Sequence, residues 1–351
     1  MASHGHRPAT GATLPAVPTL EEVAARAGVS RSTASRAING GLRVSPETLA
    51  SVEAAVAELG YLPNRAARSL VTRRTDSIAL VFPEPDERVL TDPFFAGTLS
   101  GVSAALADSD IQMVLVIARP GQSQRTVRYL RSGHVDGAIV VSHHRDDELD
   151  RALVEARLPS VFVGRPLGAT GEDDAGLQYV DVDNVEGGRL ATARLVDLGR
   201  RRIGTVAGPQ DMSAGIDRLA GWRAAMAQAG QSDDALAVGD FTIAGGTAAT
   251  RQLLAEHPDV DGIFVASDLM ASGALTALAE AGRVVPDDVA VVGYDNSAIA
   301  ASTTPPLTSV VQPVVAMARA AGLRLLDQLQ GGADTGAPMI FAPELVVRAS
   351  A

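Results

Sequence analysis

TLEEVAARAGVSRSTASRAING, residues 19–40, is the stretch that decides the fold of the amino-terminal part of the chain. Thr19 is placed to cap a first helix, and Glu22, three residues on, completes a capping box. A short turn containing glycine leads to a second helix, which runs from Ser30 or its neighbour to Asn39. This second segment carries arginines, serines and no acidic residue.

A third helix follows in SPETLASVEAAVAELG, residues 45–60. Ser45 is a capping residue, Pro46 fits the first helical turn, and apolar residues repeat at helical spacing. Two helices joined by a tight turn form a helix-turn-helix, whose second helix enters the major groove of DNA. The pattern therefore predicts a small all-α head with a candidate DNA-reading helix.

Charge is unevenly distributed along the chain. All 30 basic residues are arginine, and the net charge is -11. Residues 1–74 carry nine arginines and five glutamates, a net +4, whereas the remaining residues carry a net -15. A basic head on an acidic body indicates that only the head meets a polyanion.

Composition excludes several classes of protein. There is no cysteine, which rules out disulfides, thiolate nucleophiles and cysteine-bound metals. No stretch has the continuous apolar length of a signal peptide or a membrane span, so we expect a cytoplasmic protein. Residues 1–18 are rich in proline and small residues and are expected to form a disordered arm.

From Ser77 onward, short aliphatic runs alternate with longer helical segments. This alternation predicts parallel sheets with helical crossovers. VDGAIVVS at 135–142 recurs as VDGIFVAS at 260–267, which we interpret as a weak internal repeat, although Asp-Gly is also a common way to begin a buried strand. Two similar α/β lobes are expected, with a cleft at the carboxyl ends of their strands, where such sheets bind ligands.

Several segments together carry a family resemblance: the head sequence, VEAAVAELGYLPNRAARSL at 52–70, VAVVGYDNS at 289–297 and PPLTSVVQP at 305–313. The chain closely resembles the lactose-repressor/galactose-repressor family of bacterial transcription factors over residues 19–348. The resemblance implies an all-α helix-turn-helix head followed by a periplasmic-binding-protein-like α/β core of two doubly wound lobes. It implies these parts: a disordered arm at 1–18, the helix-turn-helix domain at 19–62, a hinge helix and linker at 63–75, and an effector-binding and dimerisation domain at 76–351, with lobe 1 at about 76–180 and 312–336 and lobe 2 at about 181–311 and 337–351.

The second helix carries the candidate DNA contacts. Arg31, Ser32 and Arg36 lie on adjoining outer faces near its start. Arginine can hold guanine O6 and N7 with two hydrogen bonds, and serine bonds to several bases. By resemblance, Arg31 and Ser32 select the sequence, and Arg36 reads a base edge. Other polar residues suit phosphate oxygens: Ser30, Thr33, Ser35 and Asn39.

YLPNRAARSL at 61–70 resembles the hinge helix of the family. A helix of under two turns is marginal by itself, because nucleation is costly. The resemblance implies that two such helices, one from each subunit, pair in the minor groove, where Leu70 wedges between base pairs and kinks the DNA. The alternative for Leu70 is a place in a core. The other matching hinge contacts are Asn64, Arg65 and Ala67.

The resemblance also implies a small-molecule site between the lobes. Sugars present hydroxyls at the ring edge and apolar patches on the ring faces, so a sugar site needs carboxylates or arginine in plane and aromatics above. Matching positions supply both kinds of group: Arg218, Asp295, Phe241 and either Phe94 or Phe95. Further cleft positions are Asp183, Ser267 and Gln312. We assign Trp222, the only tryptophan, to the core.

We therefore expect a homodimeric transcriptional repressor of carbohydrate metabolism that binds a pseudo-palindromic operator. A small-molecule effector, expected to be a neutral sugar with cellobiose as first choice, binds between the lobes and changes operator affinity allosterically. The alternatives within the family are a purine corepressor and a phosphorylated partner protein. No cofactor, metal or membrane partner is expected.

Two other classes of protein are possible in principle. HHRDDELD at 143–150 has residues that bind metals or transfer protons, but adjacent residues give poor tetrahedral geometry, and we interpret the segment as solvated. No phosphate-binding loop, dinucleotide fingerprint or G-x-S-x-G elbow occurs, so we do not expect an enzyme. A sugar-binding protein without a DNA function is disfavoured by the basic head.

Overall fold

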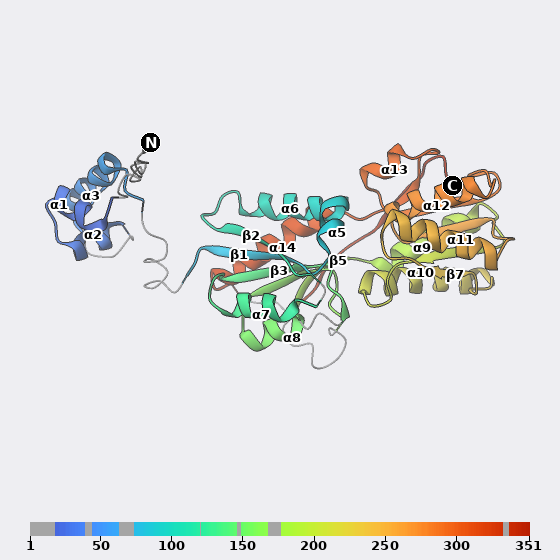
Figure 1. Cartoon of the computed structure of the whole chain (residues 1–351), viewed down its shortest axis with the longest axis horizontal. Coiled ribbons are helices and arrows are strands. Elements are labelled where there is room, and N and C mark those ends of the chain that lie inside the picture. The colour runs from blue at the N-terminus through green and yellow to red at the C-terminus, as the bar shows by residue number, and fades with distance from the viewer. Residues whose placement is uncertain are drawn as a thin grey trace, which may run out of the picture. The chain divides into compact units, whose positions relative to one another are not determined.

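The computed structural model describes seven ranges of the chain: 18–38, 44–62, 74–119, 121–145, 149–167, 177–332 and 337–351. The chain divides into two compact units, Met1–Thr75 and Asp76–Ala351, whose elements are labelled in Figure 1. Each unit has a hydrophobic core of its own. Within the described ranges no helix is long and apolar enough to cross a lipid bilayer.

The described part of the first unit consists of α1 (Leu20–Arg26), α2 (Arg31–Ile38) and α3 (Pro46–Leu59). The predicted capping box is confirmed: the Thr19 side chain accepts from the Glu22 amide, and the Glu22 side chain accepts from the Thr19 amide. Ser45 caps α3, and Gly60 ends it in the left-handed conformation that glycine adopts without strain. The small core contains Val23, Ala37, Val52 and Ala55.

The described residues of the second unit form two six-stranded sheets, which define lobe 1 and lobe 2. The lobe 1 sheet has the order β11-β5-β4-β3-β1-β2 and contains β1 (Ser77–Phe82), β2 (Gln112–Ile117), β3 (Gly137–Val141), β4 (Ser160–Val163), β5 (Gln178–Val182) and β11 (Met339–Phe341). The lobe 2 sheet has the order β12-β10-β9-β8-β6-β7 and contains β6 (Ile203–Ala207), β7 (Leu236–Val238), β8 (Gly262–Val265), β9 (Ala290–Asp295), β10 (Thr308–Val311) and β12 (Glu344–Val346). Neighbouring strands are parallel except β10 and β12.

Helices cover both faces of each sheet, so each lobe is doubly wound, as predicted (Figure 1). The helices of lobe 1 are α5 (Asp86–Thr91), α6 (Pro93–Leu106), α7 (Ser123–Arg131), α8 (Leu149–Ala156) and α14 (Val314–Leu329). Those of lobe 2 are α9 (Asn184–Asp197), α10 (Ser213–Ala229), α11 (Ile243–Glu256), α12 (Asp268–Glu280) and α13 (Ala298–Ser302). The central strands are continuous aliphatic runs because both of their faces are buried. Trp222 is fully buried in lobe 2, as expected.

The chain passes three times between the lobes: from β5 to α9, from β10 to α14, and from β11 to β12. The last passage differs from the expected boundary, which gave all of 337–351 to lobe 2. β11 instead pairs with β5 in lobe 1, and only β12 joins lobe 2. Both strands are three residues long, and their composition does not determine which sheet edge each one joins.

The internal repeat has a structural counterpart. β3 and β8 hold the same place in their sheets, each beside the first strand of its lobe. The repeat therefore ends at equivalent residues, Ser142 after β3 and Ser267 after β8. Both serines line the cavity between the lobes.

Candidate DNA-reading helix and effector cleft

The outer face of α2 presents the predicted base-reading side chains to solvent. Arg31, Ser32 and Arg36 are exposed, whereas Ala34 and Ala37 are buried against α1 and α3. The alanines allow α2 to pack closely, and the long cationic side chains consequently project from the opposite face. Such a face can enter a major groove.

Hydrogen bonds within α2 fix its polar residues. Ser30 caps the helix through its Oγ, which accepts from the Thr33 amide at 3.2 Å. The Arg36 guanidinium donates from Nε to the Ser32 carbonyl at 3.2 Å and from Nη2 to Thr33 Oγ1 at 3.4 Å. Arg31 forms an exposed ion pair with Glu21 of α1. Ser35 is half-buried on α2. The remaining predicted DNA contacts lie outside the described residues: Asn39, Asn64, Arg65, Ala67 and Leu70.

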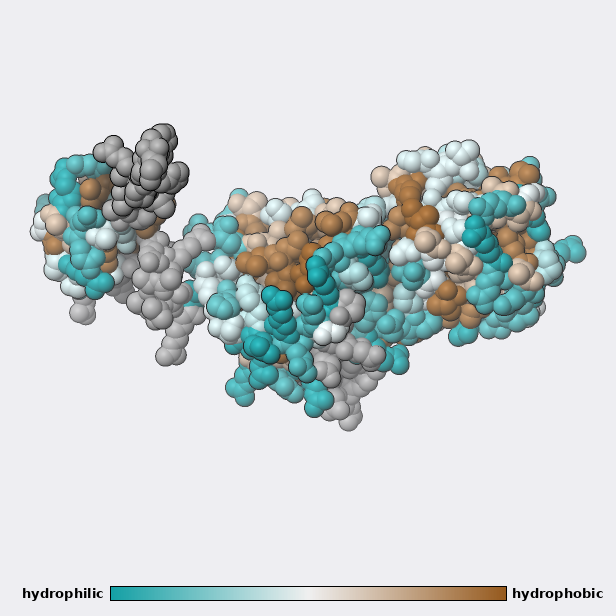
Figure 2. Space-filling model, in the orientation of Figure 1, coloured by the Kyte–Doolittle hydropathy of each residue, from teal (hydrophilic) through white to brown (hydrophobic). Residues whose placement is uncertain are grey.

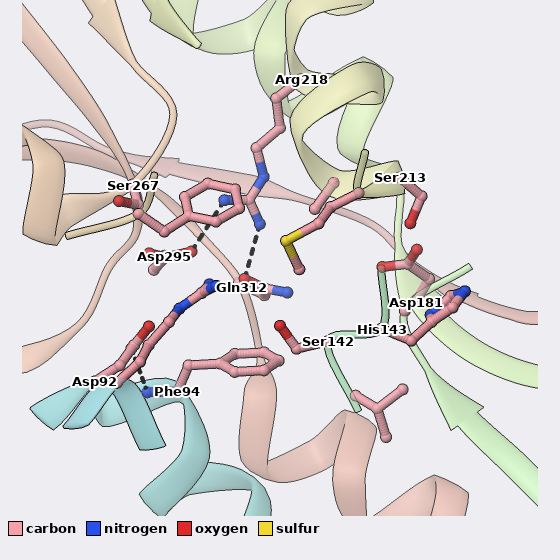
Figure 3. Close-up of a pocket in the computed structure, with 16 residues that line it drawn as sticks. Asp92, Phe94, Ser142, His143, Asp181, Ser213, Arg218, Ser267, Asp295 and Gln312 are labelled. Carbon is pink, nitrogen blue, oxygen red and sulfur yellow. Dashed lines mark hydrogen bonds and ion pairs between the residues drawn. The ribbon is translucent and has the colours of Figure 1, made fainter. Parts of the chain in front are cut away.

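A cavity of about 70 Å³ lies between the two lobes of the second unit (Figure 3). Lobe 1 supplies α5, the start of α6, the end of β5 and the segments at the ends of β3 and β4. Lobe 2 supplies the start of α10, the segment before α11, the residue before α12 and the end of β9, and Gln312 follows β10. The lining residues are Arg88, Asp92, Phe94, Ser142, His143, Val163, Gly164, Asp181, Met212, Ser213, Ala214, Arg218, Phe241, Ser267, Asp295 and Gln312.

Arg218 is the central cation of this cavity and reaches into it from α10 (Figure 3). Its side chain is only 3% exposed. The guanidinium donates to Asn184 Oδ1 at 2.9 Å, to the Ala266 carbonyl at 2.6 Å and to Gln312 Oε1 at 2.9 Å, and it pairs with Asp295 at 3.3 Å. It also lies 3.6 Å from the Tyr294 ring centroid. The guanidinium is therefore fixed in orientation, with its donors engaged, before any ligand arrives.

Two glycines explain how α10 places Arg218. A Cβ at Gly188 of α9 would overlap the Arg218 carbonyl oxygen, and a Cβ at Gly221 of α10 would overlap the Val185 carbonyl oxygen. Only glycine at both positions lets α9 and α10 cross this closely. The close crossing brings the Arg218 guanidinium within reach of Asn184, at the start of α9.

Three carboxyl groups face the same cavity. Burial raises the pKa of Asp181 to about 6, although the Arg165 and Val182 amides donate to it. Burial also raises the pKa of Asp92, and it raises the pKa of Asp295 well above the ordinary value, with Arg218 opposing the rise. These groups are strong acceptors when ionised and donors when protonated, a combination that suits hydroxyl ligands.

Aromatic and apolar side chains supply the other walls. Phe94 and Met212 line the cavity, and Phe241 lies beneath two guanidinium groups. The Phe241 ring centroid is 5.8 Å from the Arg218 carbon Cζ and 5.4 Å from that of Arg88. Because Arg88 belongs to lobe 1 and Phe241 to lobe 2, this second contact crosses the cleft.

Three of the six non-glycine residues that have a positive φ in the described ranges line the cavity. Ser142, Phe241 and Asp295 all line it, and all have positive φ values, of 58°, 64° and 106°. Such conformations cost about 1–3 kcal/mol each in residues other than glycine and persist where the surrounding structure enforces them. Their position at the cleft indicates a functional site.

The structure brings six of the eight predicted ligand residues to the cavity wall: Phe94, Arg218, Phe241, Ser267, Asp295 and Gln312. Of the two alternatives Phe94 and Phe95, Phe94 lines the cavity, whereas the Phe95 side chain packs in the lobe 1 core against Phe82. The assignment of Asp183 was wrong. Its side chain caps α9 by accepting from the Glu186 amide, whereas Asp181, two residues earlier, faces the cavity.

The interpretation of 143–150 as a solvated segment was wrong for its first two residues. His143 is buried and lines the cavity, and its Nε2 accepts from the Leu167 amide at 3.3 Å. His144 contacts Glu84 and Asp211. The physical reason is that β3 ends at Val141, so these residues lie at the carboxyl edge of the sheet, which faces the cleft.

Several other residues of the cavity were not predicted from the sequence, including Arg88, Asp181 and Met212. One signal was available for Asp181, since a carboxylate inside the strand sequence QYVDV has no reason to be buried without a partner. No local signal marked Arg88 or Met212, because both reach the cavity from short segments whose direction depends on the packing of the lobes.

Comparison with known proteins agrees with this architecture. The family model described as "Bacterial regulatory proteins, lacI family" matches residues 19–64, and the model described as "Periplasmic binding protein-like domain" matches residues 192–351. HTH-type transcriptional regulator CelR of Thermobifida fusca is 50% identical over 336 residues, covering 95% of this chain and 98% of CelR. HTH-type transcriptional repressor CytR of Escherichia coli (strain K12) is 32% identical over 338 residues, covering 95% of this chain and 96% of CytR.

Solved structures show the same relationship. A complex of the transcriptional regulator CelR with cellobiose has a TM-score of 0.76 and 46% identity, covering 95% of this chain and 100% of that chain. A lac repressor dimer bound to operator and the anti-inducer ONPF has a TM-score of 0.82 and 28% identity, covering 95% of this chain and 99% of that chain. From its helix-turn-helix head, its two-lobed core and these relatives, the chain belongs to the lacI family of bacterial transcriptional regulators.

Proposed function

We propose that this regulator is a homodimeric repressor that binds operator DNA through α2 and is released when a neutral sugar, with cellobiose as the first candidate, occupies the cleft. The observation that carries the proposal is the state of Arg218, which is buried and already paired with Asp295. A buried cation whose donors are already engaged, in a cleft that also holds three carboxyl groups, favours an uncharged polyol over a phosphate.

The rest of the cleft supports the same ligand class. Asp92, Asp181 and Asp295 offer acceptors for hydroxyls in the plane of a sugar ring, while Phe94 and Phe241 offer apolar surfaces for its faces. The relative CelR, whose structure is described as a cellobiose complex, shares 46% identity with this chain in that comparison. A purine corepressor is the alternative ligand, and the binding experiment below separates the two.

The cavity must enlarge to accept such a ligand. Small-molecule pockets usually measure about 300–1,000 Å³, whereas the cavity between the lobes measures about 70 Å³. We infer that the lobes separate to admit the sugar and close around it. An effector that prefers one arrangement of the lobes shifts the population toward that arrangement.

DNA recognition is proposed for the exposed face of α2 and for the hinge. In this proposal Arg31, Ser32 and Arg36 read base edges, and the neighbouring polar residues of α2 hold phosphates. The hinge contacts at 64–70, with Leu70 as the wedge, belong to the same proposal. A protein that binds bacterial operator DNA acts in the cytoplasm.

Dimerisation is proposed through the face of lobe 1 formed by α6, α14 and β2, where Figure 2 shows apolar residues gathered. β2 is an edge strand of sequence QMVLVI, and none of its residues is fully buried. An uncovered apolar edge strand invites pairing with another chain. The exposed apolar side chains of this face are Leu99, Leu115, Val315 and Leu323.

Leu115→Asp tests the dimer. Placing a carboxylate on this edge strand should convert the dimer to monomers in analytical ultracentrifugation, because charges are depleted from interface cores. The matched control is Leu198→Asp, at a similarly exposed leucine in lobe 2. If both variants sediment like the native protein, this face is not the dimer interface.

The principal test is fluorescence-anisotropy binding of the full chain to DNA from upstream of its own and neighbouring genes, at fixed salt. Cellobiose, glucose, lactose, adenine and guanine are then titrated against the bound fragment. Release of one specific fragment by cellobiose alone supports the proposal. Binding that requires a purine would replace the sugar with a corepressor, and an absence of any specific fragment would contradict the repressor function.

A further inference from the structure

His144 contacts both lobes of the second unit. Its Nδ1 lies 2.8 Å from Asp211 Oδ2, in the segment before α10 of lobe 2. Its Nε2 lies 3.2 Å from Glu84 Oε1, in the segment after β1 of lobe 1. A protonated imidazole carries an N–H on each ring nitrogen, so it can donate to two carboxylates at once.

The lobe 1 end of this contact is firmly anchored. Glu84 is 2% exposed, and its Oε1 also accepts from Arg88 Nη1 at 2.6 Å and from Ser142 Oγ at 2.9 Å. Arg88 and Ser142 both line the cavity. The buried carboxylate therefore joins His144 to the wall of the effector cleft.

The lobe 2 end of the contact lies beside the ligand-binding helix. Asp211 precedes α10 by two residues and also accepts, through its carbonyl, from the Arg145 amide at 2.9 Å. A second ion pair joins Arg165 of lobe 1 to Asp217 of α10 at 2.8 Å. Both contacts hold the amino-terminal end of α10, the helix that carries Arg218, against lobe 1.

We propose that His144 is a positioning residue for the effector response: by bridging Glu84 and Asp211 it holds the lobes together and so sets how tightly the cleft closes on its ligand. The part of this inference that concerns effector affinity rests on the proposed function. The part that concerns lobe closure does not, since it follows from contacts within the protein.

The protonation of His144 gives this bridge a pH range. Its hydrogen bond to Glu84 is the main reason that the pKa of His144 is raised to about 9. The charged groups that face the ring include Glu84 and Asp211, and Arg88 reaches Glu84 from α5. Opening of the lobes separates His144 from Asp211 but leaves the ring beside Glu84, so only the Asp211 contribution to the raised pKa is linked to closure. The stabilisation of the closed form by the protonated ring is therefore present at neutral pH and is lost as the pH rises through about 9.

Closure can be measured directly because the chain has no cysteine. Gln124→Cys on α7 and Ala255→Cys on α11 place one spin label on an exposed position of each lobe. Pulsed electron paramagnetic resonance on the full chain then gives the distribution of distances between the lobes. It is recorded at pH 6.5 and pH 9.5, without effector.

For the native protein we expect a single distribution of label-to-label distances at pH 6.5. At pH 9.5 the distribution should become broader, and its mean distance should change. His144→Gln should already show the broadened distribution at pH 6.5 and should not change with pH. Asp211→Asn, at an exposed carboxylate, should behave in the same way, and the double variant should add nothing further. His134→Gln, at an exposed histidine stacked on Tyr129 in lobe 1, is the matched control and should follow the native protein.

The same variants are titrated with cellobiose. Allosteric coupling between two sites usually amounts to a few kcal/mol at most. With a coupling of this size between the His144 bridge and the cleft, the Kd for cellobiose should be about tenfold higher in His144→Gln and Asp211→Asn than in the native protein. If cellobiose binds none of the proteins, native included, the proposed effector is wrong while the distance measurement still decides the role of His144. The inference is overturned if His144→Gln keeps the native distance distribution at both pH values.

Discussion

Arg31 on α2 and Arg218 on α10 carry the same guanidinium group in opposite surroundings. The Arg31 side chain is 70% exposed, and its ion-pair partner Glu21 is 62% exposed. Arg218 is 3% exposed and has hydrogen-bond partners from four separate segments of lobe 2 and the lobe connection. An exposed charge stays available to a polyanion and is screened by salt, whereas a buried one is fixed in place by its hydrogen-bond partners.

The contrast separates two kinds of recognition. DNA presents dense negative charge, and a protein meets it with cations that are free to leave weak local partners. A neutral sugar presents hydroxyls with fixed directions, and a site for it needs donors and acceptors that are already oriented. The proposed function uses both kinds in a single chain.

The largest expected effect comes from breaking the buried arginine network. Arg218→Met leaves Asp295 without its cation and should lower the free energy of unfolding by about 3–5 kcal/mol, as well as abolish the effector response. Arg223→Met, at an arginine of α10 that is half exposed and 3.7 Å from Asp233, should change the free energy of unfolding by only about 0–1 kcal/mol. Urea unfolding measures the free energy of unfolding, and fluorescence anisotropy measures the effector response.

Arg218→Lys covers the possibility that Arg218→Met does not fold. Lysine keeps the charge and loses the planar, forked donors, so it should fold, bind DNA and respond weakly to effector. If this variant responds to effector as the native protein does, the assignment of Arg218 to the ligand site is wrong.

A second test concerns the buried carboxyl of Asp181, whose pKa is raised to about 6. The unfolded chain ionises this group near pH 4 and the folded chain near pH 6, so the folded protein loses stability as the pH rises between these values. Relative to Asp181→Asn, the native protein should lose about 2–3 kcal/mol between pH 4 and pH 6. Urea unfolding of both proteins between pH 4 and pH 6 measures this loss of stability.

The control for this test is Asp183→Asn, because asparagine caps a helix about as well as aspartate and Asp183 lies outside the cavity. It should leave the pH dependence of unfolding unchanged. Equal slopes for Asp181→Asn and the native protein would mean that Asp181 is not desolvated as the structure indicates.

Arg31→Ala tests the role of the exposed arginine. Losing a base contact from each half-site should weaken specific binding by about 1–3 kcal/mol per contact and relax the preference at one base position. Nonspecific binding should change little. Anisotropy with the released fragment and its point variants provides the measurement, and Arg26→Ala, whose partner is Glu58 of α3, is the control. An unchanged base preference would contradict the role of Arg31.

The smallest effect is expected from the partner of Arg31. Glu21→Gln frees the guanidinium from an exposed ion pair and removes a negative charge from the head, so operator binding should tighten by at most about 1 kcal/mol. Glu58→Gln removes the same charge from α3 without touching Arg31. If the two variants tighten binding equally, the gain comes from net charge alone.

The candidate site was only partly predictable from the sequence. The family resemblance assigned Arg218, Asp295 and Gln312 to the cleft, and all three line the cavity. The sequence left Phe94 and Phe95 as alternatives, and Asp183 was misplaced by two residues relative to Asp181. A shift of one residue on a helix or at a strand end changes the direction of a side chain, and only the packing of α6 and α9 fixes that direction.

His143 and His144 illustrate the other limit of prediction. Their sequence context, with many neighbouring acids, is typical of a solvated segment. In the fold they follow β3 at the edge of the sheet where the two lobes meet, and their partners lie 24 to 67 residues away in sequence. No local pattern reports partners at such separations.

The sequence by itself determined the elements of this protein: the capping box of α1, the proline and glycine that bound α3, the repeated strands β3 and β8, and the basic head. These are local properties, because capping, periodicity and charge are set by residues within a few positions of one another. Tertiary structure decided which side chains line the cleft, where β11 pairs, and that Glu84, His144 and Asp211 meet. Burial and charge pairing between distant segments depend on how the lobes pack, and that packing is a property of the whole second unit.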